Sequence, residues 1–241
     1  MLSAMAFAAI LIGFSKTSFA SIASVSVAIF ALGIPAKEST AAVLLLLITG
    51  DIVGIALFGR HASWRLLVRL VPTVIVGLGL GALFMRFVDD HVMRLTIGAI
   101  LLVSVLIQIW QRRTPSDAPP PASPNWVAAG ATGVAAGFTT MTANAAGPVM
   151  ALYLLAARID KIRFIGTNAW FFGIINVSKL PLTASLGLFT PQVMWLFAAG
   201  VPFVLLGTAL GRVVVHRVTQ RQFELVTMFA AAGGALTLLL T

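Results

Sequence analysis

The sequence predicts an all-α integral membrane protein made of two homologous halves, and three observations support this prediction. Of 241 residues, 59% are hydrophobic and only 10% are charged, whereas soluble domains carry about 25% charged residues. Apolar segments recur along the whole chain at lengths that suit a bilayer. Glycine and proline positions of the first half also recur in the second half at constant offsets.

Ten apolar segments make up this organisation. A spanning helix needs about 20 residues, because it rises about 1.5 Å per residue across about 30 Å of hydrocarbon. The segments of that length are 40–59, 66–85, 92–110, 164–188, 193–211 and 222–240. The shorter segments form two pairs, 1–14 with 18–34 and 126–138 with 144–157. Polar stretches interrupt both pairs, so we expect each half to contain a broken or re-entrant helix pair and three spanning helices.

One stretch, residues 114–124, has the composition of a linker and reads TPSDAPPPASP. Proline lacks a backbone donor and clashes with the preceding helical turn, so this stretch cannot stay helical. It is polar and nearly central, and we expect it to be cytoplasmic. It separates a first transmembrane repeat, residues 1–113, from a second, residues 125–241.

The evidence for duplication is the spacing of particular residues. The recurring positions are Gly13-Phe14 with Gly137-Phe138, at an offset of 124, and Pro72, Gly77 and Gly81 with Pro202, Gly207 and Gly211, at an offset of 130. Asp51 falls near the counterpart of Asn176. The paired glycines also predict close helix packing, either within the chain or in a homodimer.

Basic residues decide between parallel and inverted copies, because they concentrate in cytoplasmic loops. If each broken pair is a single crossing, the copies are parallel and the better orientation puts nine basic residues inside and five outside. If each pair is re-entrant or two short spans, the copies are inverted and the division is eleven to three, with Lys16 and Lys179 set apart as intramembrane. We therefore predict inverted repeats in the cell inner or plasma membrane. Both versions place the two termini on the non-cytoplasmic side.

The two interruptions, residues 15–18 and 139–144, predict the substrate site. A helix that stops inside the membrane leaves backbone groups unpaired, which is tolerated beside a cavity or a ligand. Half-helix N-termini attract anions, and the site of such transporters lies where the repeats meet. The residues expected around a small anionic substrate are Ser15, Lys16, Thr17, Thr140 and Asn144, with Asn176 and Lys179 as second choices.

Other interpretations of these residues stay open. Lys16 either binds or gates, or its ammonium reaches water at the interface. Lys179 either serves the site, since a buried cation needs a partner, or lies at a helix end kinked by Pro181. Asp51 is a candidate proton-coupling carboxylate or a structural partner of one of the lysines. For Asn144 and Asn176 the alternative is hydrogen bonding between helices.

The sequence argues against several other classes of protein. We find no paired carboxylate within a predicted cavity and no HExxH, nucleophile elbow or phosphate-binding loop, so we expect no enzyme. A hydrolase using Ser15 and Lys16 is disfavoured, because adjacent helical residues point about 100° apart. Cysteine is absent and the three histidines are scattered, so we expect no metal and no cofactor. The net charge of +9 is spread between apolar runs, which indicates contact with membrane lipids rather than nucleic acid.

Two stretches are informative about the family of the chain. The more specific is GFTTMTANAAGPVMALYLLAARIDKIRFIGTNAWFFGIINVSKLPL (137–182), and its weaker counterpart begins GFSKTSFASIASVSVAIFALGIPAKESTAA (13–42). Both resemble the TauE/SafE sulfite-exporter family. The resemblance extends over nearly the whole chain, including the duplicated organisation. It implies secondary transport of sulfite, sulfonates or related organic anions, usually as export. It also implies that the breaks at 13–18 and 137–148 belong to the functional core.

The chain departs from that family at the breaks. Many relatives have a glycine cluster followed by proline, roughly G-x-G-G-G, where this chain has hydroxyl residues and Lys16, and only Gly147-Pro148 matches the usual ending. This departure leaves room for a substrate other than sulfite, such as a sulfonate with a carbon skeleton. From these observations we expect a secondary transporter of small anions that works by alternating access, with a passive anion channel as the alternative. A membrane scaffold without transport is the third possibility.

Overall fold

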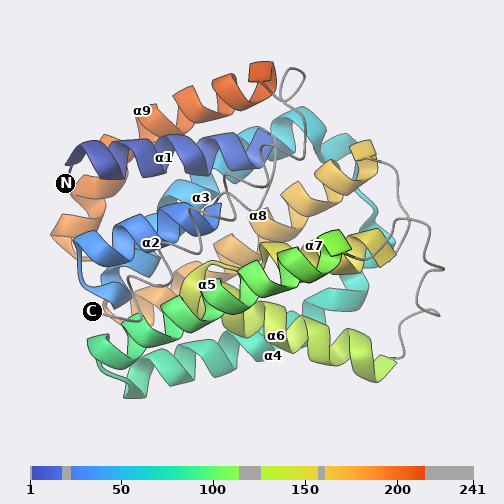
Figure 1. The fold of residues 1–241 in the computed structure, drawn as a ribbon, viewed down its shortest axis with the longest axis horizontal. Helices are drawn as coiled ribbons and strands as arrows, with labels where there is room; N and C mark the ends of the chain where they lie inside the picture. Colours follow the sequence, from blue (N-terminus) through green and yellow to red (C-terminus); the bar gives the residue numbers. More distant parts are fainter. Residues whose placement is uncertain (1, 18–22, 114–125, 157–160, 215–241) are drawn as a thin grey trace.

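The computed structural model describes residues 2–17, 23–113, 126–156 and 161–214, and the regular structure in these ranges is helical (Figure 1). The elements are α1 (Leu2–Thr17), α2 (Ala23–Gly33), α3 (Ala36–Phe58), the 3-10 turn η2 (Gly59–His61), α4 (Trp64–Phe87), α5 (Asp90–Arg113), α6 (Trp126–Ala143), α7 (Gly147–Ala156), α8 (Lys161–Ser185) and α9 (Pro191–Val214). The predicted all-α class is confirmed. The predicted linker 114–124 and the predicted span 222–240 lie outside the described residues.

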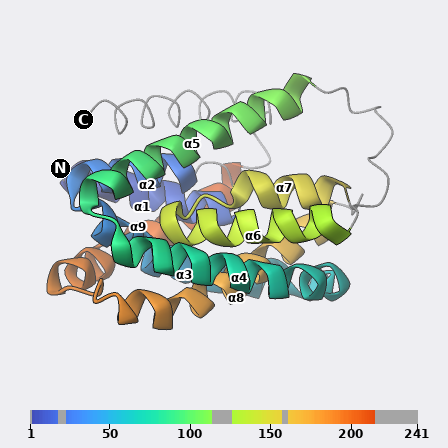
Figure 2. The same cartoon turned by 90° about the horizontal axis from the view of Figure 1, so that it is seen from below.

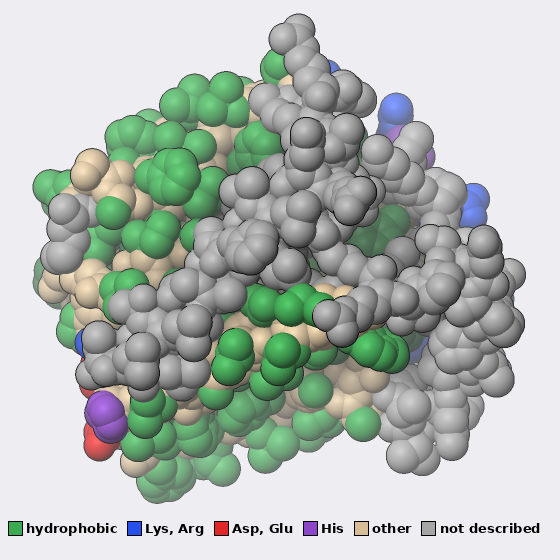
Figure 3. All heavy atoms as spheres, in the orientation of Figure 1, with side chains coloured by type: hydrophobic (Ala, Val, Ile, Leu, Met, Phe, Trp, Pro, Cys, Tyr) green, Lys and Arg blue, Asp and Glu red, His purple; other side chains and the backbone are tan. Residues whose placement is uncertain are grey.

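Within the described residues, four helices are long and apolar enough to cross a membrane. They are Ala36–His61, Trp64–Phe87, Asp90–Ile107 and Pro191–Val213. Large apolar side chains on these helices point outward, among them Ile52, Val68, Leu83 and Trp195. Figure 3 shows such side chains across the described part of one face, with charged ones gathered toward the two ends. An apolar surface of this extent is stable in lipid and not in water, so the chain is a membrane protein.

The helix ends differ from the prediction at both breaks. The polar stretches were expected to interrupt the helices, but α1 continues to Thr17 and α6 continues to Ala143. The reason is that the hydroxyls bond back to carbonyls of the preceding turn, where they do not compete with the helix. Ser15 Oγ donates to Ile12 O at 2.7 Å, and Thr142 Oγ1 donates to Phe138 O at 2.9 Å. Hydroxyl-rich sequence is therefore compatible with the last turn of each helix.

The second break begins at Asn144. This residue has φ 50°, the left-handed conformation that ends many helices and that asparagine tolerates better than most residues. The N–H of Asn144 donates to Thr140 O, and the N–H of Ala145 donates to Thr139 O. Both bonds satisfy carbonyls at the end of α6. Gly147 then begins α7, and Pro148 suits its first turn because the N–H it lacks would have no helical partner there.

Helix packing joins the first part of the chain to the last. The most extensive contacts are between α1 and α9 and between α4 and α6, while α3 and α8 pack together at the centre. In Figure 1, α1, α3 and α9 run from left to right, whereas α4, α6 and α8 run from right to left. Figure 2 shows the same directions after rotation about the horizontal axis.

The closest backbone contacts occur at the recurring glycines. A Cβ built on four of them would clash with a backbone carbonyl of the neighbouring helix, so only glycine allows the approach there. The glycines and the residues whose carbonyls they face are Gly13 with Val204, Gly137 with Val74, Gly207 with Ile10 and Gly77 with Val134. The recurring glycines thus mediate helix packing within the chain.

Candidate functional site

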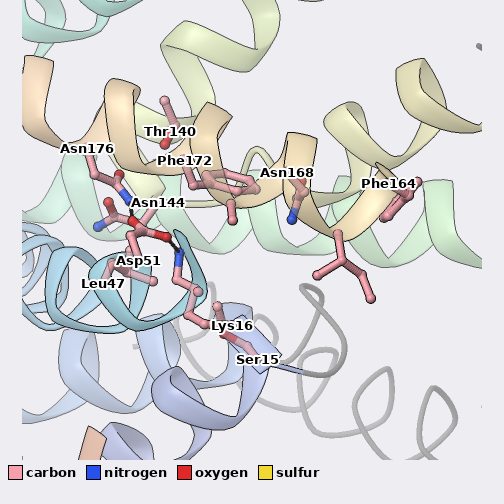
Figure 4. Close-up of a pocket in the computed structure, with 15 residues that line it drawn as sticks. Ser15, Lys16, Leu47, Asp51, Thr140, Asn144, Phe164, Asn168, Phe172 and Asn176 are labelled. Carbon is pink, nitrogen blue, oxygen red and sulfur yellow. Dashed lines mark hydrogen bonds and ion pairs between the residues drawn. The ribbon is translucent and has the colours of Figure 1, made fainter. Parts of the chain in front are cut away.

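A small cavity of about 60 Å³ lies where α1, α3, α8 and the junction of α6 with α7 meet (Figure 4). A volume of this size holds a few water molecules or a small ion, but not a drug-sized ligand. Its lining residues are Ser15, Lys16, Ala23, Leu47, Asp51, Gly54, Thr140, Asn144, Gly147, Phe164, Ile165, Asn168, Ala169, Phe172 and Asn176.

An ion pair between α1 and α3 forms one wall of the cavity. Lys16, in the last turn of α1, places its Nζ 2.6 Å from Asp51 Oδ1 in α3. The Asp51 side chain is 2% exposed and that of Lys16 is 10% exposed, so the lysine reaches the cavity and the carboxylate lies behind it. Gly50 leaves room for the lysine stem, because a Cβ there would lie 2.8 Å from Lys16 Cγ. The ammonium also lies 4.9 Å from the centre of the Phe172 ring, within the range of a cation–π contact.

Asn176 in α8 connects this ion pair to the second lysine. Its amide Nδ2 donates to Asp51 Oδ2 at 2.7 Å, and its Oδ1 accepts from Lys179 Nζ at 3.0 Å. Asn176 is fully buried. The donor end of its amide faces the carboxylate of Asp51, and the acceptor end faces the amine of Lys179. Figure 4 shows Lys16, Asp51 and Asn176 as one continuous chain of contacts.

Lys179 is surrounded by neutral oxygens at the end of α6. Besides Asn176, its Nζ donates to Thr140 O at 2.9 Å, to Thr140 Oγ1 at 3.3 Å and to Asn144 Oδ1 at 2.5 Å. Asn144 in turn donates its Nδ2 to Thr40 O at 3.1 Å, which joins this group to α3. Lys179 is 1% exposed. Each of these oxygens can accept a hydrogen bond, so together they can satisfy the three donors of an ammonium group.

The structure brings together most of the residues predicted from sequence. Those that line the cavity are Ser15, Lys16, Asp51, Thr140, Asn144 and Asn176. Lys179 lies behind the wall that Thr140, Asn144 and Asn176 form. Thr17 lies outside the cavity lining, because its Oγ1 donates to Thr208 O in α9 at 3.1 Å. One helical position beyond Lys16 is enough to turn Thr17 toward a different neighbour.

Sequence reasoning did not assign Asn168 to the site, although its side chain faces the same cavity. A signal was present in the spacing: Asn168, Phe172 and Asn176 are four residues apart and share one face of α8. Leu47 and Asp51 have the same spacing on α3. Periodicity within the two central helices would therefore have found these lining positions.

The charges at the site do not balance. In their charged forms Lys16 and Lys179 carry two positive charges, and the carboxylate that contacts Lys16 and Asn176, that of Asp51, carries one negative charge. One positive charge is therefore left over in a buried, polar place. This surplus of positive charge suits the arrangement to an anion. The described residues contain no group of three or more His, Cys, Asp or Glu that could hold a metal ion.

Comparison with known proteins agrees with this chemistry. The family model described as sulfite exporter TauE/SafE matches residues 5–238, nearly the whole chain. The chain belongs to this family. No curated protein and no solved structure gives a match. Membership of the TauE/SafE family makes the chain a membrane protein of a transporter family, and the resemblance expected from the two sequence stretches is confirmed.

Proposed function

We propose that this chain is a secondary transporter that exports small anions, sulfite or short sulfonates, across the plasma membrane by alternating access. The observation that supports the proposal best is the unbalanced positive charge beside a small buried cavity. An unpaired charge inside a membrane protein is costly unless a partner or water compensates it. A substrate with one or two negative charges supplies that compensation.

The cavity offers suitable groups for such an anion. Lys16 Nζ provides a cation, and Asn168 provides an amide that can donate hydrogen bonds. Gly147, at the start of α7, also lines the cavity, so the positive end of this half-helix lies nearby. The remaining wall includes Phe164 and Ile165, which suit the short carbon chain of a sulfonate. The cavity volume of about 60 Å³ favours inorganic anions and the smallest organic ones.

Alternating access is supported by the relation between the two halves. We propose that α1 to α5 and the chain from α6 onward are inverted repeats. Helices in equivalent positions, α1 with α6, α3 with α8 and α4 with α9, run in opposite directions (Figure 1). The glycine contacts between α1 and α9 match those between α6 and α4, residue by residue. Repeats of this kind move against each other around a fixed central site. The distribution of basic residues supports an orientation with the start of α1 on the non-cytoplasmic side.

Asp51 has a place in this mechanism as the candidate coupling group. It holds Lys16 when no substrate is bound, so an incoming anion competes with the carboxylate for the same ammonium. Protonation of Asp51 would remove that competition and favour anion binding. The carboxylate thereby links the proton and the substrate through a single contact.

The test is uptake of radiolabelled sulfite and short sulfonates into proteoliposomes by the wild type, Lys16→Met and Lys37→Met. Lys37 is the matched control, because it lies at the start of α3 and not in the cavity lining. We expect saturable uptake in the wild type and the control, and a loss of at least about tenfold in Lys16→Met with folding intact. Equal uptake by all three proteins would contradict the proposal. Uptake that never exceeds equilibrium under an imposed proton gradient would favour a channel.

A further inference from the structure

The oxygens around Lys179 have the character of a cation-binding site. Three acceptors come from two side-chain amides and one hydroxyl, and the fourth is the Thr140 carbonyl in the last turn of α6. All four lie within 3.3 Å of the lysine nitrogen. Carbonyl and amide oxygens without a charged ligand are the groups that replace the water shell of monovalent cations in membrane proteins.

The position of these oxygens within the fold is equally informative. The C-terminal end of a half-helix carries partial negative charge, and in transporters with broken helices such ends coordinate the coupling cation. Here that position is taken by an ammonium on the chain itself. We propose that Lys179 is a tethered substitute for a monovalent metal cation, and that removing its side chain opens a site for Na⁺ or K⁺.

The residue of the first half that corresponds to Lys179 is a glycine, Gly54. Asp51 corresponds to Asn176 at an offset of 125 residues, and at the same offset Gly54 corresponds to Lys179. A Cβ built on Gly54 would lie 3.5 Å from Lys16 O, just as Lys179 points at Thr140 O in the second half. In the first half, the last turn of α1 therefore forms although the residue that faces it from α3, Gly54, has no side chain. The amine is therefore needed at the end of α6 for its charge rather than to form the helix end.

The ligand class follows from the contact atoms. The site would offer four neutral oxygens, with water filling the volume left by the lysine stem. The Asp51 carboxylate is separated from it by Asn176. Divalent cations favour sites that contain carboxylate ligands. The vacated site is thus suited to a single positive charge, which is the charge that Lys179 supplies.

Thermal unfolding of the purified protein tests the proposal without any assumption about the transported anion. The proteins are the wild type, Lys179→Ala and Lys179→Met, each in choline, sodium and potassium chloride at equal ionic strength. Methionine is the matched control, because it fills the volume of the lysine stem and provides no charge. We expect Na⁺ or K⁺ to raise the Tm of Lys179→Ala saturably by about 4 °C relative to choline. The wild type and Lys179→Met should show no such preference.

Most other outcomes contradict the proposal, and one supports it. If Lys179→Ala unfolds at the same temperature in all three salts, or if all three proteins respond equally, no cation site has been opened. If Lys179→Ala can be purified folded only in sodium or potassium salts, the proposal is supported, and if it folds in no salt it fails. A wild type that requires an inorganic monovalent cation for anion transport would also overturn it. Failure of anion transport with a positive Tm result would count against the proposed function alone.

Discussion

Gly77 of α4 and Gly137 of α6 face each other so closely that a Cβ built on Gly77 would lie 2.9 Å from the Gly137 Cα. The same Cβ would also meet the Val134 carbonyl. We predict that Gly77→Ala forces the two helices apart and costs about 1–3 kcal/mol of stability, the usual effect of overpacking. Reversible unfolding in mixed micelles measures the change.

Gly79 provides the control for this prediction. It lies two residues further along α4, and a Cβ there would meet nothing within 4 Å. Gly79→Ala should leave the unfolding free energy within about 0.5 kcal/mol of the wild type. Equal destabilisation by the two substitutions would show that helix flexibility, and not the crossing with α6, is responsible.

The ion pair between Lys16 and Asp51 should be strongly coupled. Removing one partner leaves the other as an uncompensated buried charge, which typically costs about 3–5 kcal/mol. We therefore expect Lys16→Met and Asp51→Leu each to destabilise the protein more than the double variant does. A double-mutant cycle on unfolding free energies measures this, and additive effects would mean that the two charges do not interact.

Asn144 combines a backbone requirement with side-chain contacts, and two substitutions separate them. Asn144→Gly keeps the left-handed conformation at φ 50° but loses the bonds to Lys179 and Thr40. Asn144→Ala loses those bonds and adds backbone strain of about 1 kcal/mol. We expect alanine to be the less stable variant by that amount in thermal unfolding. Equal stabilities would indicate that the backbone conformation at the break carries no strain.

Asn168 is expected to act on binding rather than on stability. It is half-buried at the cavity and its amide is available to a bound anion. Asn168→Leu should weaken sulfite binding by about tenfold, the effect of losing a hydrogen bond to a charged group. Isothermal titration measures the Kd, and thermal unfolding should be nearly unchanged. A large loss of stability with unchanged affinity would make Asn168 a packing residue.

Cysteine labelling distinguishes inverted from parallel repeats, and the natural chain has no cysteine to interfere. Arg65 and Asp89 are exposed at opposite ends of α4. With inverted repeats and the predicted orientation, Arg65→Cys should react with an impermeant maleimide from the cytoplasmic side and Asp89→Cys from the other side. Parallel repeats with both termini outside require the opposite result.

Sequence reasoning located the helices well because the membrane imposes their length. The hydropathy of residues 36–58 or 191–214 leaves few alternatives to a long helix. The glycine spacing predicted close helix packing but not its partners, which the structure shows to be α1 with α9 and α4 with α6. The ends of α1 and α6 were placed too early, because a hydroxyl can either break a helix or bond within it. That choice depends on neighbouring carbonyls that composition does not reveal.

The site itself was only partly predictable. Polar residues are few in an apolar chain. Lys16, Asp51 and Lys179 could be recognised because a charged side chain inside the membrane is energetically costly. Which lysine pairs with Asp51 depends on the direction of each side chain across three helices, and sequence left that choice open. The neutral surroundings of Lys179 include a backbone carbonyl, that of Thr140, and no sequence pattern specifies such a contact.

The odd number of charges at the centre has an evolutionary consequence. An ancestor assembled from two identical halves would contribute every charged group twice, so its central site would always hold an even number of charges. The combination of Lys16, Asp51 and Lys179 is odd, and Gly54 and Thr140 occupy the positions where a symmetric partner would carry the missing lysines. Under the proposed duplication, a single surplus charge is therefore available only to a fused gene whose halves have diverged. Neither half, duplicated, would reproduce it.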